Sequence, residues 1–421
     1  MGKLSRKVAI VGAGMSKFGQ WWPIKQNRDL WQDALISAMN SVDQNFDMND
    51  VEELFLGNFT ADLFNHESHL APLMAQIAGL NPKPATRFES ACASSGLALR
   101  HAVISIASGM TDLVLVGGIE TMTEVPTVDV TDALASASDT RLEYPAGATF
   151  PGLYAAVATA HMHEYGTKDE DLFNVAIKNY ENGAQNPFAQ VQMTIEQVME
   201  DKLRKAEKRG KPTPKWKGGT PYDFLRSSSN PYIAYPLRLF DCSLVTDGAA
   251  ALFLASEDVA KKYTDTPIWI TGTGQGSATL QLADRKSLTS FGATKAAAET
   301  AFQMSGLGPK DIQIAEVHDC FTIAEVVALE DLGFYEKGKA VVGIREGETK
   351  RDGKLPINTS GGLKTKGHPV GTTGAAQAVE IFKQMRGRAE RNRQVKFDVE
   401  CALTHNLGGS GATCVIHTYE K

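Results

Sequence analysis

Short runs rich in apolar residues alternate along the chain with longer stretches in which apolar residues recur every three or four positions. A run without regular polar alternation predicts a strand covered on both faces, and such runs occupy residues 7–11, 51–57, 112–118 and 248–254. Helical periodicity occupies residues 29–42, 93–107 and 294–304. This alternation predicts a layered α/β fold built on a mainly parallel sheet.

The first predicted strand runs directly into Gly12-Ala13-Gly14. A dinucleotide-binding turn needs a further glycine at position 17, where this chain has Lys17. We therefore expect these glycines to form a plain strand-to-helix turn without a nucleotide.

The middle of the chain differs in composition from the two ends. Residues 126–238 are richer in polar residues, with a charged helical pattern at 193–208 and a stretch rich in Pro, Gly and Lys at 210–221. This composition predicts an inserted loop or cap region, where long functional loops are usually found. The expected division is an N-terminal half of residues 1–125 plus 239–262, the insertion at 126–238, and a C-terminal half of residues 263–421.

The last third of the chain repeats a pattern of the first. Residues 49–57 and 310–318 each follow an amphipathic helix and form a short polar turn that leads into an apolar strand. A turn of small residues that opens a helix also recurs, at residues 90–96 and 371–374. A long internal repeat predicts two similar halves packed about a pseudo-twofold axis.

Composition narrows the functional class. The chain has 421 residues, of which 43% are hydrophobic and 22% charged, as in folded globular proteins and unlike disordered or membrane-spanning ones. With 43 basic against 49 acidic residues, it has no cationic excess to bind nucleic acid. The 5 cysteines include no Cys-x-x-Cys pair, so neither a disulfide framework nor a zinc motif is expected. Unpaired thiols indicate a reducing compartment, and with no apolar signal segment we expect the cytoplasm.

One cysteine lies in a setting that favours chemistry. Cys92 stands in Glu-Ser-Ala-Cys-Ala-Ser-Ser-Gly, directly before a predicted helix. The free N–H groups and positive dipole end of a helix N-terminus favour a thiolate, and small neighbours let a substrate approach. A buried structural cysteine is the other interpretation. The glycine- and serine-rich surroundings favour a nucleophile.

A nucleophilic thiol needs a base and a cradle for an oxyanion. His368 lies in Gly-His-Pro-Val-Gly, and His318 stands beside Asp319 and Cys320 after an apolar strand. The first motif also fits a surface turn, and the second also fits part of a metal cluster, although no further ligand has suitable spacing. The glycine-rich turn at residues 405–411 offers backbone N–H groups for an oxyanion hole, or forms a tight β-turn.

Together these motifs resemble the thiolase superfamily, and more narrowly its sterol-carrier-protein-2-type and archaeal-type branch. The resemblance covers essentially the whole chain and rests on ordered motifs at residues 89–96, 318–321, 367–371 and 406–409. Most thiolases have Asn-Glu-Ala-Phe where this chain has His-Asp-Cys-Phe, and Cys-x-Gly where it has Asn-Leu-Gly. Both departures occur together in that branch. The resemblance implies a thiolase fold of two similar βαβαβαββ halves, in a five-layer αβαβα arrangement with an inserted loop domain.

The resemblance also implies roles for individual side chains. His368 accepts the proton of Cys92, whose sulfur attacks the 3-oxo carbon of a 3-oxoacyl-CoA. His318 and His368 then stabilise the enolate. Cys320 takes the acid/base role of the family's second cysteine, with Cys401 and Cys414 as fallback candidates that more plainly belong to strand cores.

The same resemblance implies how the intermediate is held and what is bound. The backbone N–H groups of Cys92 and Gly408 hold the acyl-enzyme oxyanion, and Asn406 belongs to the same substrate-binding turn. Coenzyme A is a substrate, and neither a metal nor a bound cofactor is expected. A homodimer or dimer of dimers is expected, together with a small partner built from a zinc ribbon and an OB-fold. The basic stretch 202–217 is either a solvated face or a contact for CoA phosphates or such a partner.

Other functions and several substrates remain open. A ketoacyl-synthase-like condensing enzyme shares the fold and the nucleophile but lacks a second thiol, so Cys320 discriminates. A non-catalytic acyl-CoA- or lipid-binding subunit is disfavoured by the intact cysteine and histidines. The substrate is either short, such as acetoacetyl-CoA, or bulky and aromatic, such as benzoylsuccinyl-CoA. Aromatic residues of the insertion either line a bulky acyl pocket or form a local core, and they are Phe188, Trp216, Tyr222, Phe224, Tyr232 and Tyr235.

Overall fold

The computed structural model describes residues 2–390 and 392–421, and within them a mixed nine-stranded sheet forms the centre of the fold. The strands of the N-terminal half are β1 (Val8–Met15), β2 (Glu53–Gly57), β3 (Ala85–Phe88), β4 (Leu113–Glu120) and β7 (Gly248–Ser256). Those of the C-terminal half are β8 (Ile268–Ser277), β9 (Ile314–Glu316), β10 (Cys401–Gly408) and β11 (Thr413–Glu420). Every run in which the sequence predicted a strand contains one.

The two halves have the same strand order, as the internal repeat predicts. Counted from the middle of the sheet, the N-terminal half runs β1-β7-β4-β2-β3 and the C-terminal half runs β8-β11-β10-β9. An isolated parallel bridge between Ala315 and Ile357 stands where the fifth strand of the second half is expected. Antiparallel pairing of β1 with β8 joins the halves into one sheet.

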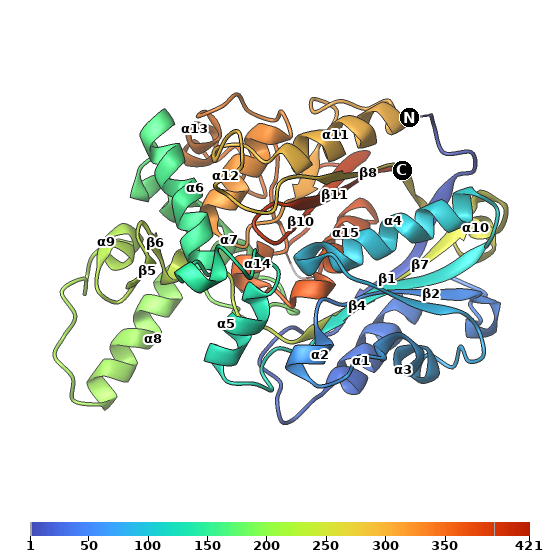
Figure 1. The fold of residues 1–421 in the computed structure, drawn as a ribbon, viewed down its shortest axis with the longest axis horizontal. Helices are drawn as coiled ribbons and strands as arrows, with labels where there is room; N and C mark the ends of the chain where they lie inside the picture. Colours follow the sequence, from blue (N-terminus) through green and yellow to red (C-terminus); the bar gives the residue numbers. More distant parts are fainter. Residues whose placement is uncertain (1, 391) are drawn as a thin grey trace.

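Helices divide the fold into five layers, as the resemblance implies (Figure 1). One outer layer contains α1 (Asn27–Met39), α3 (Leu70–Ile77) and α10 (Glu257–Tyr263). The central layer, between the two half-sheets, contains α4 (Ser94–Ala107) and α15 (Thr373–Met385). The other outer layer contains α11 (Gly292–Ser305) and α12 (Thr322–Asp331), and the shorter helices are α2 (Ala61–Phe64), α13 (Ala340–Arg345) and α14 (Gly362–Thr365).

The expectation of a mainly parallel sheet is wrong. In the part of the chain that the structure describes, only the pairs β2–β3, β2–β4 and β9–β10 of this sheet are parallel. The strands that pair with the middle of the sheet, β7 and β11, run antiparallel to both of their neighbours. Helices cover both faces of these strands too, and so their sequences are as uniformly apolar as those of parallel strands.

The glycines after residue 11 lie inside β1 and not in a turn. A Cβ atom on Gly14 would lie 2.2 Å from the backbone nitrogen of Ala38, and one on Gly12 would lie 2.4 Å from the Val42 side chain. Glycine is therefore needed for the close approach of α1 to the strand. The predicted strand-to-helix turn is wrong at this position.

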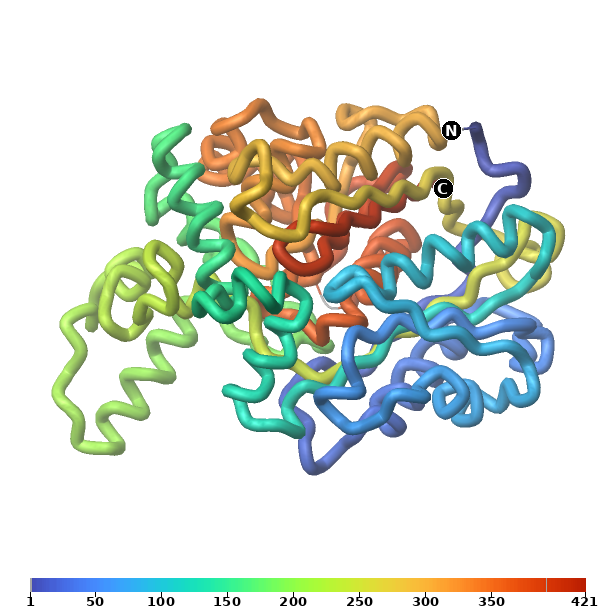
Figure 2. Tube along the Cα trace, in the orientation of Figure 1, coloured from blue at the N-terminus to red at the C-terminus, as the bar shows by residue number. Residues whose placement is uncertain are grey.

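The insertion contains α5 (Thr127–Ala135), α6 (Phe150–Tyr165), α7 (Asp169–Ala184), α8 (Ile195–Lys208) and α9 (Pro221–Arg226), and a hairpin of β5 (Tyr232–Ala234) and β6 (Leu237–Arg238). Its outer part, around α8, projects from one end of the molecule (Figure 2). Trp216 and Phe224 lie in a small core of its own, whereas Tyr232 and Tyr235 are exposed. Among the described helices none is both long and apolar enough to cross a bilayer.

Candidate active site

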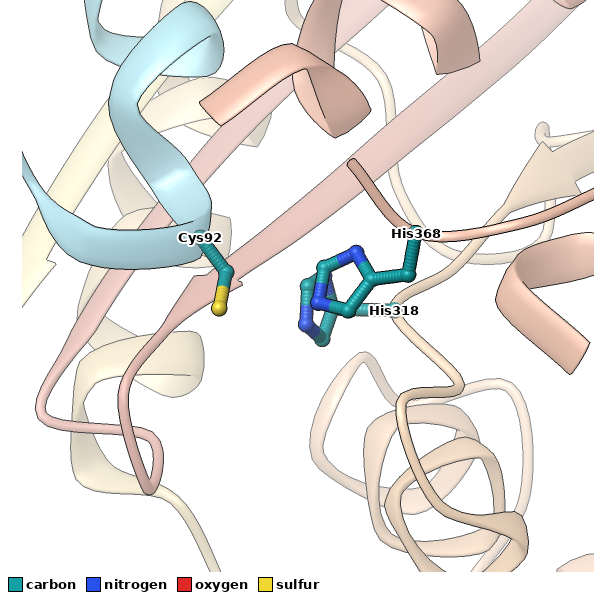
Figure 3. A group of neighbouring side chains, drawn as sticks. All are labelled: Cys92, His318 and His368. Atoms are coloured by element: carbon teal, nitrogen blue, oxygen red, sulfur yellow. The ribbon is translucent and has the colours of Figure 1, made fainter. Parts of the chain in front are cut away.

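A thiol and two imidazole rings from three separate segments meet between the two halves. Cys92 lies in the 3-10 turn η2 (Ala91–Ala93) before α4, His318 follows β9, and His368 lies in the loop between α14 and the 3-10 turn η5 (Val370–Thr372). The sulfur and one nitrogen of each ring all lie within 4.8 Å of one another, and the ring centroids are 5.0 Å apart at 81° (Figure 3). The structure therefore brings together the three side chains in which the sequence predicted chemistry.

The turn that carries Cys92 is held by local hydrogen bonds. The Ser94 hydroxyl accepts a hydrogen bond from the backbone N–H of Ser90 at 3.0 Å and donates one to the carbonyl oxygen of Ala91 at 2.6 Å. Ala91 has a φ of +49°, in the left-handed region that non-glycine residues rarely adopt. Such a conformation persists only where its surroundings enforce it, and here it places the thiol opposite the two rings.

Burial determines the ionisation of the nucleophile. It raises the pKa of Cys92 to about 12, with backbone N–H groups of Gly409 and of Cys92 itself acting against it. Burial therefore acts against the thiolate that the helix N-terminus is expected to favour, because the loss of hydration opposes the helix dipole. Without substrate the site holds a neutral thiol that needs a base.

The loop around His368 prepares that ring to act as the base. Its Nδ1 lies 2.7 Å from the Thr373 hydroxyl oxygen, and the single hydrogen of this hydroxyl is donated to the carbonyl oxygen of Pro369 at 3.3 Å. We therefore assign the ring proton to Nδ1, which leaves Nε2 as an acceptor. Burial lowers the pKa of His368 to about 3, assisted by the positive charge of Lys366. The neutral ring can accept the proton of Cys92.

His318 has the opposite tautomer. The side-chain nitrogen of Asn406 lies 3.2 Å from His318 Nδ1, and an amide nitrogen can only donate, so the ring proton is on Nε2. That Nε2 is buried and has no hydrogen-bond partner among the described residues. Burial lowers the pKa of His318 well below its ordinary value, and the nearby His368 and His405 lower it further. The ring is therefore a neutral donor for a substrate oxygen.

The two residues after His318 lie in different environments. The Asp319 carboxylate accepts hydrogen bonds from the backbone N–H of Leu363 at 2.7 Å and from the Asn179 amide at 2.8 Å. It thereby fixes α14 and α7 to the loop after β9. Cys320 lines the same pocket as Cys92, where burial raises its pKa and the Tyr154 hydroxyl lowers it. The motif thus supplies a hydrogen-bond donor in His318, a carboxylate that holds two helices in Asp319, and a second thiol in Cys320.

A mostly apolar pocket of about 180 Å³ opens in front of the two thiols and His368. Its apolar walls come from the loop after β4, α5, α6 and the segment before β7, and they include Met122, Val130, Leu134, Phe150, Leu244 and Val245. The aromatic residues of the insertion that the sequence offered as a pocket wall are all described, and they do not line it. That interpretation is wrong, because Trp216 and Phe224 serve the local core of the insertion.

The glycine-rich turn lies beside the nucleophile. Gly408 ends β10, and a Cβ atom there would lie 2.4 Å from the carbonyl oxygen of Ser90, so glycine is needed for the turns to meet. Besides the N–H of Cys92 itself, the N–H that lowers the pKa of the Cys92 thiol belongs to Gly409, one residue beyond the predicted donor Gly408. The role of the Gly408 N–H stays a prediction.

Several supporting residues carry little or no signal in the sequence. Glu120 ends β4, is fully buried, and accepts hydrogen bonds from the backbone N–H groups of Phe59 at 2.8 Å and Gly371 at 3.0 Å. Burial raises the pKa of Glu120 to about 7. In the sequence, the available signal for Glu120 was a single acidic residue at the end of an apolar strand. Tyr154 has no comparable signal, because it lies within an ordinary helical pattern, and Thr373 lies in the turn of small residues at 371–374 without a signal of its own.

The same cluster has the composition of a metal site. In the part of the chain that the structure describes, one group of three potential metal ligands lies close together. It consists of Cys92, His318 and His368. Zinc bonds of about 2.0–2.3 Å in a tetrahedron bring ligand atoms to roughly 3.3–3.8 Å from one another. The cluster, with spacings up to 4.8 Å, is wider than that. The cluster is better described as a thiol that faces a base and a hydrogen-bond donor.

Comparisons with known proteins find relatives over nearly the whole chain. Two family models match the chain, "Thiolase, N-terminal domain" over residues 8–214 and "Thiolase C-terminal domain-like" over residues 274–421. An acetyl-CoA acetyltransferase of Methanothermobacter thermautotrophicus is 43% identical over 99% of this chain and 100% of that protein. The benzoylsuccinyl-CoA thiolase subunit BbsB of Thauera aromatica is 30% identical over 97% of this chain and 96% of that subunit. A solved structure described as the Ltp2-ChsH2(DUF35) aldolase matches with a TM-score of 0.78 and 25% identity, over 98% of each chain.

Proposed function

The chain belongs to the thiolase family, a family of acyltransferases, and we propose that it catalyses CoA-dependent thiolysis of a 3-oxoacyl-CoA, or the reverse Claisen condensation. The observation that carries this proposal is the convergence of Cys92, His318 and His368 within 4.8 Å at an apolar pocket. A thiol, a neutral base and a free N–H donor are the groups that acyl transfer from carbon to sulfur requires.

The first half-reaction forms the acyl-cysteine. The Cys92 sulfur attacks the 3-oxo carbon while Nε2 of His368 takes the thiol proton. The carbon–carbon bond breaks, and its electrons pass to the departing thioester as an enolate. His318 Nε2–H and the protonated His368 donate to the enolate oxygen, and Cys320 gives its proton to the enolate carbon.

The second half-reaction transfers the acyl group to CoA. The Cys320 thiolate takes the proton of incoming CoA, whose sulfur attacks the acyl carbon on Cys92. Backbone N–H groups of Cys92 and of the Gly408–Gly409 turn hold the tetrahedral oxyanion. Cys92 leaves and recovers its proton from His368, so each proton returns to its starting group. No step requires a metal or a bound cofactor.

We propose a short acyl group, with acetoacetyl-CoA as the reference substrate. The relative named for acetyl transfer is 43% identical, against 30% for the one named for benzoylsuccinyl-CoA. The pocket of about 180 Å³ is comparable to a cavity of roughly 150 Å³ that holds one benzene molecule, and it must also admit the thiol end of CoA. The small volume therefore favours a short acyl group over a benzoylsuccinyl group.

Two other functions fit the site less well. A ketoacyl-synthase-like enzyme has no use for Cys320, which lines the pocket beside Cys92. A non-catalytic acyl-CoA- or lipid-binding subunit has no use for two histidines with opposite tautomers.

We also propose a homodimer or dimer of dimers and a small partner of the zinc-ribbon and OB-fold kind. Support for a partner comes from the solved relative whose description names a second protein, ChsH2(DUF35). If the purified chain alone has full activity and normal affinity for CoA, the partner is not required.

The test is a thiolysis assay across acyl sizes with matched cysteine variants. Wild type is expected to cleave acetoacetyl-CoA fastest, and Cys92→Ser is expected to lose at least 1,000-fold in kcat, since removal of a catalytic nucleophile costs up to roughly 10⁶-fold. Cys414→Ser is the control, because that thiol is buried in β11 away from the pocket. Cys320→Ala is expected to accumulate an acyl-enzyme that is visible by mass spectrometry. Activity in Cys92→Ser, or faster cleavage of benzoylsuccinyl-CoA, contradicts the proposal.

A further inference from the structure

Tyr154 of α6 is a buried polar residue at the pocket for which the mechanism above has no task. Its ring is 1% exposed, stacks on Phe321 with centroids 4.7 Å apart at 26°, and meets Phe291 edge-on at 6.2 Å. Apolar contacts of this kind fix the ring but do not require a hydroxyl. A phenylalanine would fill the same space.

The hydroxyl nevertheless belongs to a residue that lines the same pocket as both reactive sulfurs. It donates a hydrogen bond to the carbonyl oxygen of Gly409 at 3.2 Å, and it interacts with the Cys320 thiol. Gly409 in turn presents its N–H toward the Cys92 thiol. One hydroxyl from the insertion is therefore hydrogen-bonded to the turn beside the nucleophile and lines the pocket with the acid/base thiol, whose pKa it lowers.

Few other polar groups face Cys320. The titratable groups that act on it are Tyr154, Cys92 and Asp319, and the ammonium group of Lys364 acts on it from behind the pocket. Lys364 is buried near Asp241, Cys242 and Asp319, and it forms no hydrogen bond with the described residues. On the pocket side, Thr131, Tyr154 and Ser243 are the hydroxyl residues that share the pocket lining with Cys320, and the Tyr154 hydroxyl lowers the pKa of the Cys320 thiol.

We propose that Tyr154 is a positioning residue for the acid/base thiol, holding Cys320 and the Gly409 turn in register through one hydroxyl. When Cys320 gives its proton to the enolate carbon, the hydroxyl hydrogen turns from the Gly409 carbonyl to the new thiolate. When Cys320 takes the proton of CoA, the hydrogen returns to Gly409. Tyr154 keeps its proton throughout, so the atoms and charges of the reaction are unchanged. The inference rests on the proposed acid/base role of Cys320.

The experiment compares Tyr154→Phe with Tyr180→Phe. Tyr180 is a buried tyrosine in the core of the insertion, away from the pocket. Tyr154→Phe keeps the ring stacked on Phe321 and is expected to fold. Tyr154→Phe removes the proposed hydrogen bond to the charged Cys320 thiolate. Its kcat is therefore expected to fall about 10- to 100-fold at nearly unchanged KM. Tyr180→Phe is expected to keep the wild-type kcat.

A second readout separates positioning from packing. In a Cys92→Ser background, the rate at which iodoacetamide alkylates Cys320 is followed against pH by mass spectrometry of its peptide. A donor to the thiolate lowers the pKa of the thiol, so Tyr154→Phe is expected to shift the profile to higher pH by about one unit. A purely structural role leaves this profile where it is.

The outcomes distinguish the inference from the proposed function. If Cys320→Ala turns over normally, the acid/base assignment fails, and with it this inference. If Cys320→Ala stalls while Tyr154→Phe has wild-type kcat and an unshifted profile, the inference alone is overturned.

Discussion

The side-chain amide of Asn406 donates a hydrogen bond to the carbonyl oxygen of Cys92 at 3.0 Å. The same nitrogen lies 3.2 Å from Nδ1 of His318. Asn406 comes from the C-terminal half and Cys92 from the N-terminal half, so one amide fixes the nucleophile's turn and sets the tautomer of the donor ring. The site therefore depends on how the two halves pack together.

Asn406→Asp tests this amide. A carboxylate cannot donate, so His318 is expected to move its proton to Nδ1 and to lose the Nε2–H that meets the enolate oxygen. Removal of one such donor predicts a loss of about 100- to 1,000-fold in kcat for acetoacetyl-CoA thiolysis.

Asn186→Asp is the matched control for this change. Its amide is also buried and donates to the Ser360 carbonyl oxygen at 2.8 Å, outside the pocket. It is expected to lose stability but not kcat. An Asn406→Asp enzyme within a few-fold of wild type would show that another group sets the tautomer.

The reactivity of Cys92 should depend on pH as a neutral thiol does. Burial raises its pKa to about 12, and a raised thiol pKa means that the protonated form predominates at neutral pH. The rate of iodoacetamide inactivation is therefore expected to rise from pH 6 to pH 10 without reaching a plateau. A plateau already at pH 6 would indicate a resting thiolate–imidazolium pair.

Much of this site could be predicted from the sequence, and the failures have physical causes. Cys92, His318 and His368 each stand in a short local motif of small residues or turns, and so their convergence follows once the fold is recognised. The ionisation of Cys92 depends on burial by distant segments, which no local motif reports. Tyr154 was missed because it reaches the pocket from an ordinary helix, and Gly12 because its meaning lies in how closely α1 approaches β1.

Chelation should leave the enzyme active. We assign Cys92, His318 and His368 to acyl transfer and not to an ion, so prolonged treatment with EDTA is expected to change kcat less than twofold. The treated protein is measured without its proposed partner, because a zinc ribbon would itself respond. Loss of activity that zinc restores would place a metal on these three side chains.

A buried ion pair behind the site should matter for stability. Lys178 Nζ lies 2.8 Å from Glu325 Oε1, with both side chains almost fully buried. Lys178→Met is expected to cost about 3–5 kcal/mol of unfolding free energy, because it leaves the Glu325 carboxylate buried without its cation. Denaturant titration of the purified variant measures the loss.

Lys350→Met is the control for the ion pair. Lys350 and Glu181 are 3.3 Å apart with both side chains roughly half exposed, where an ion pair contributes little. The double variant Lys178→Met, Glu325→Gln is expected to recover part of the loss. Equal effects of the two single lysine variants would mean that the buried carboxylate finds another partner.

The hydroxyl of Thr373 should determine whether His368 acts as a base. It accepts from Nδ1 at 2.7 Å, and Thr373→Val keeps the shape of the side chain but removes that acceptor. Without it the ring proton is free to move to Nε2, which then faces Cys92 as a donor and cannot take the thiol proton. We expect kcat to fall on the order of 100-fold, within the range for loss of general-base catalysis, with KM nearly unchanged. Alkylation of Cys92 at neutral pH should slow in parallel, because both reactions need the same proton transfer.

Thr372→Val separates this effect from the loss of a buried hydroxyl. Thr372 is the adjacent residue, and its hydroxyl donates to the Gly248 carbonyl oxygen at 2.9 Å without touching His368. Thr373→Val loses two buried hydrogen bonds and Thr372→Val loses one, and each lost bond is expected to lower the unfolding free energy by about 1 kcal/mol. Only Thr373→Val should lower kcat and slow alkylation. If the two variants lose kcat equally, the defect comes from the packing of α15 and not from the tautomer of His368.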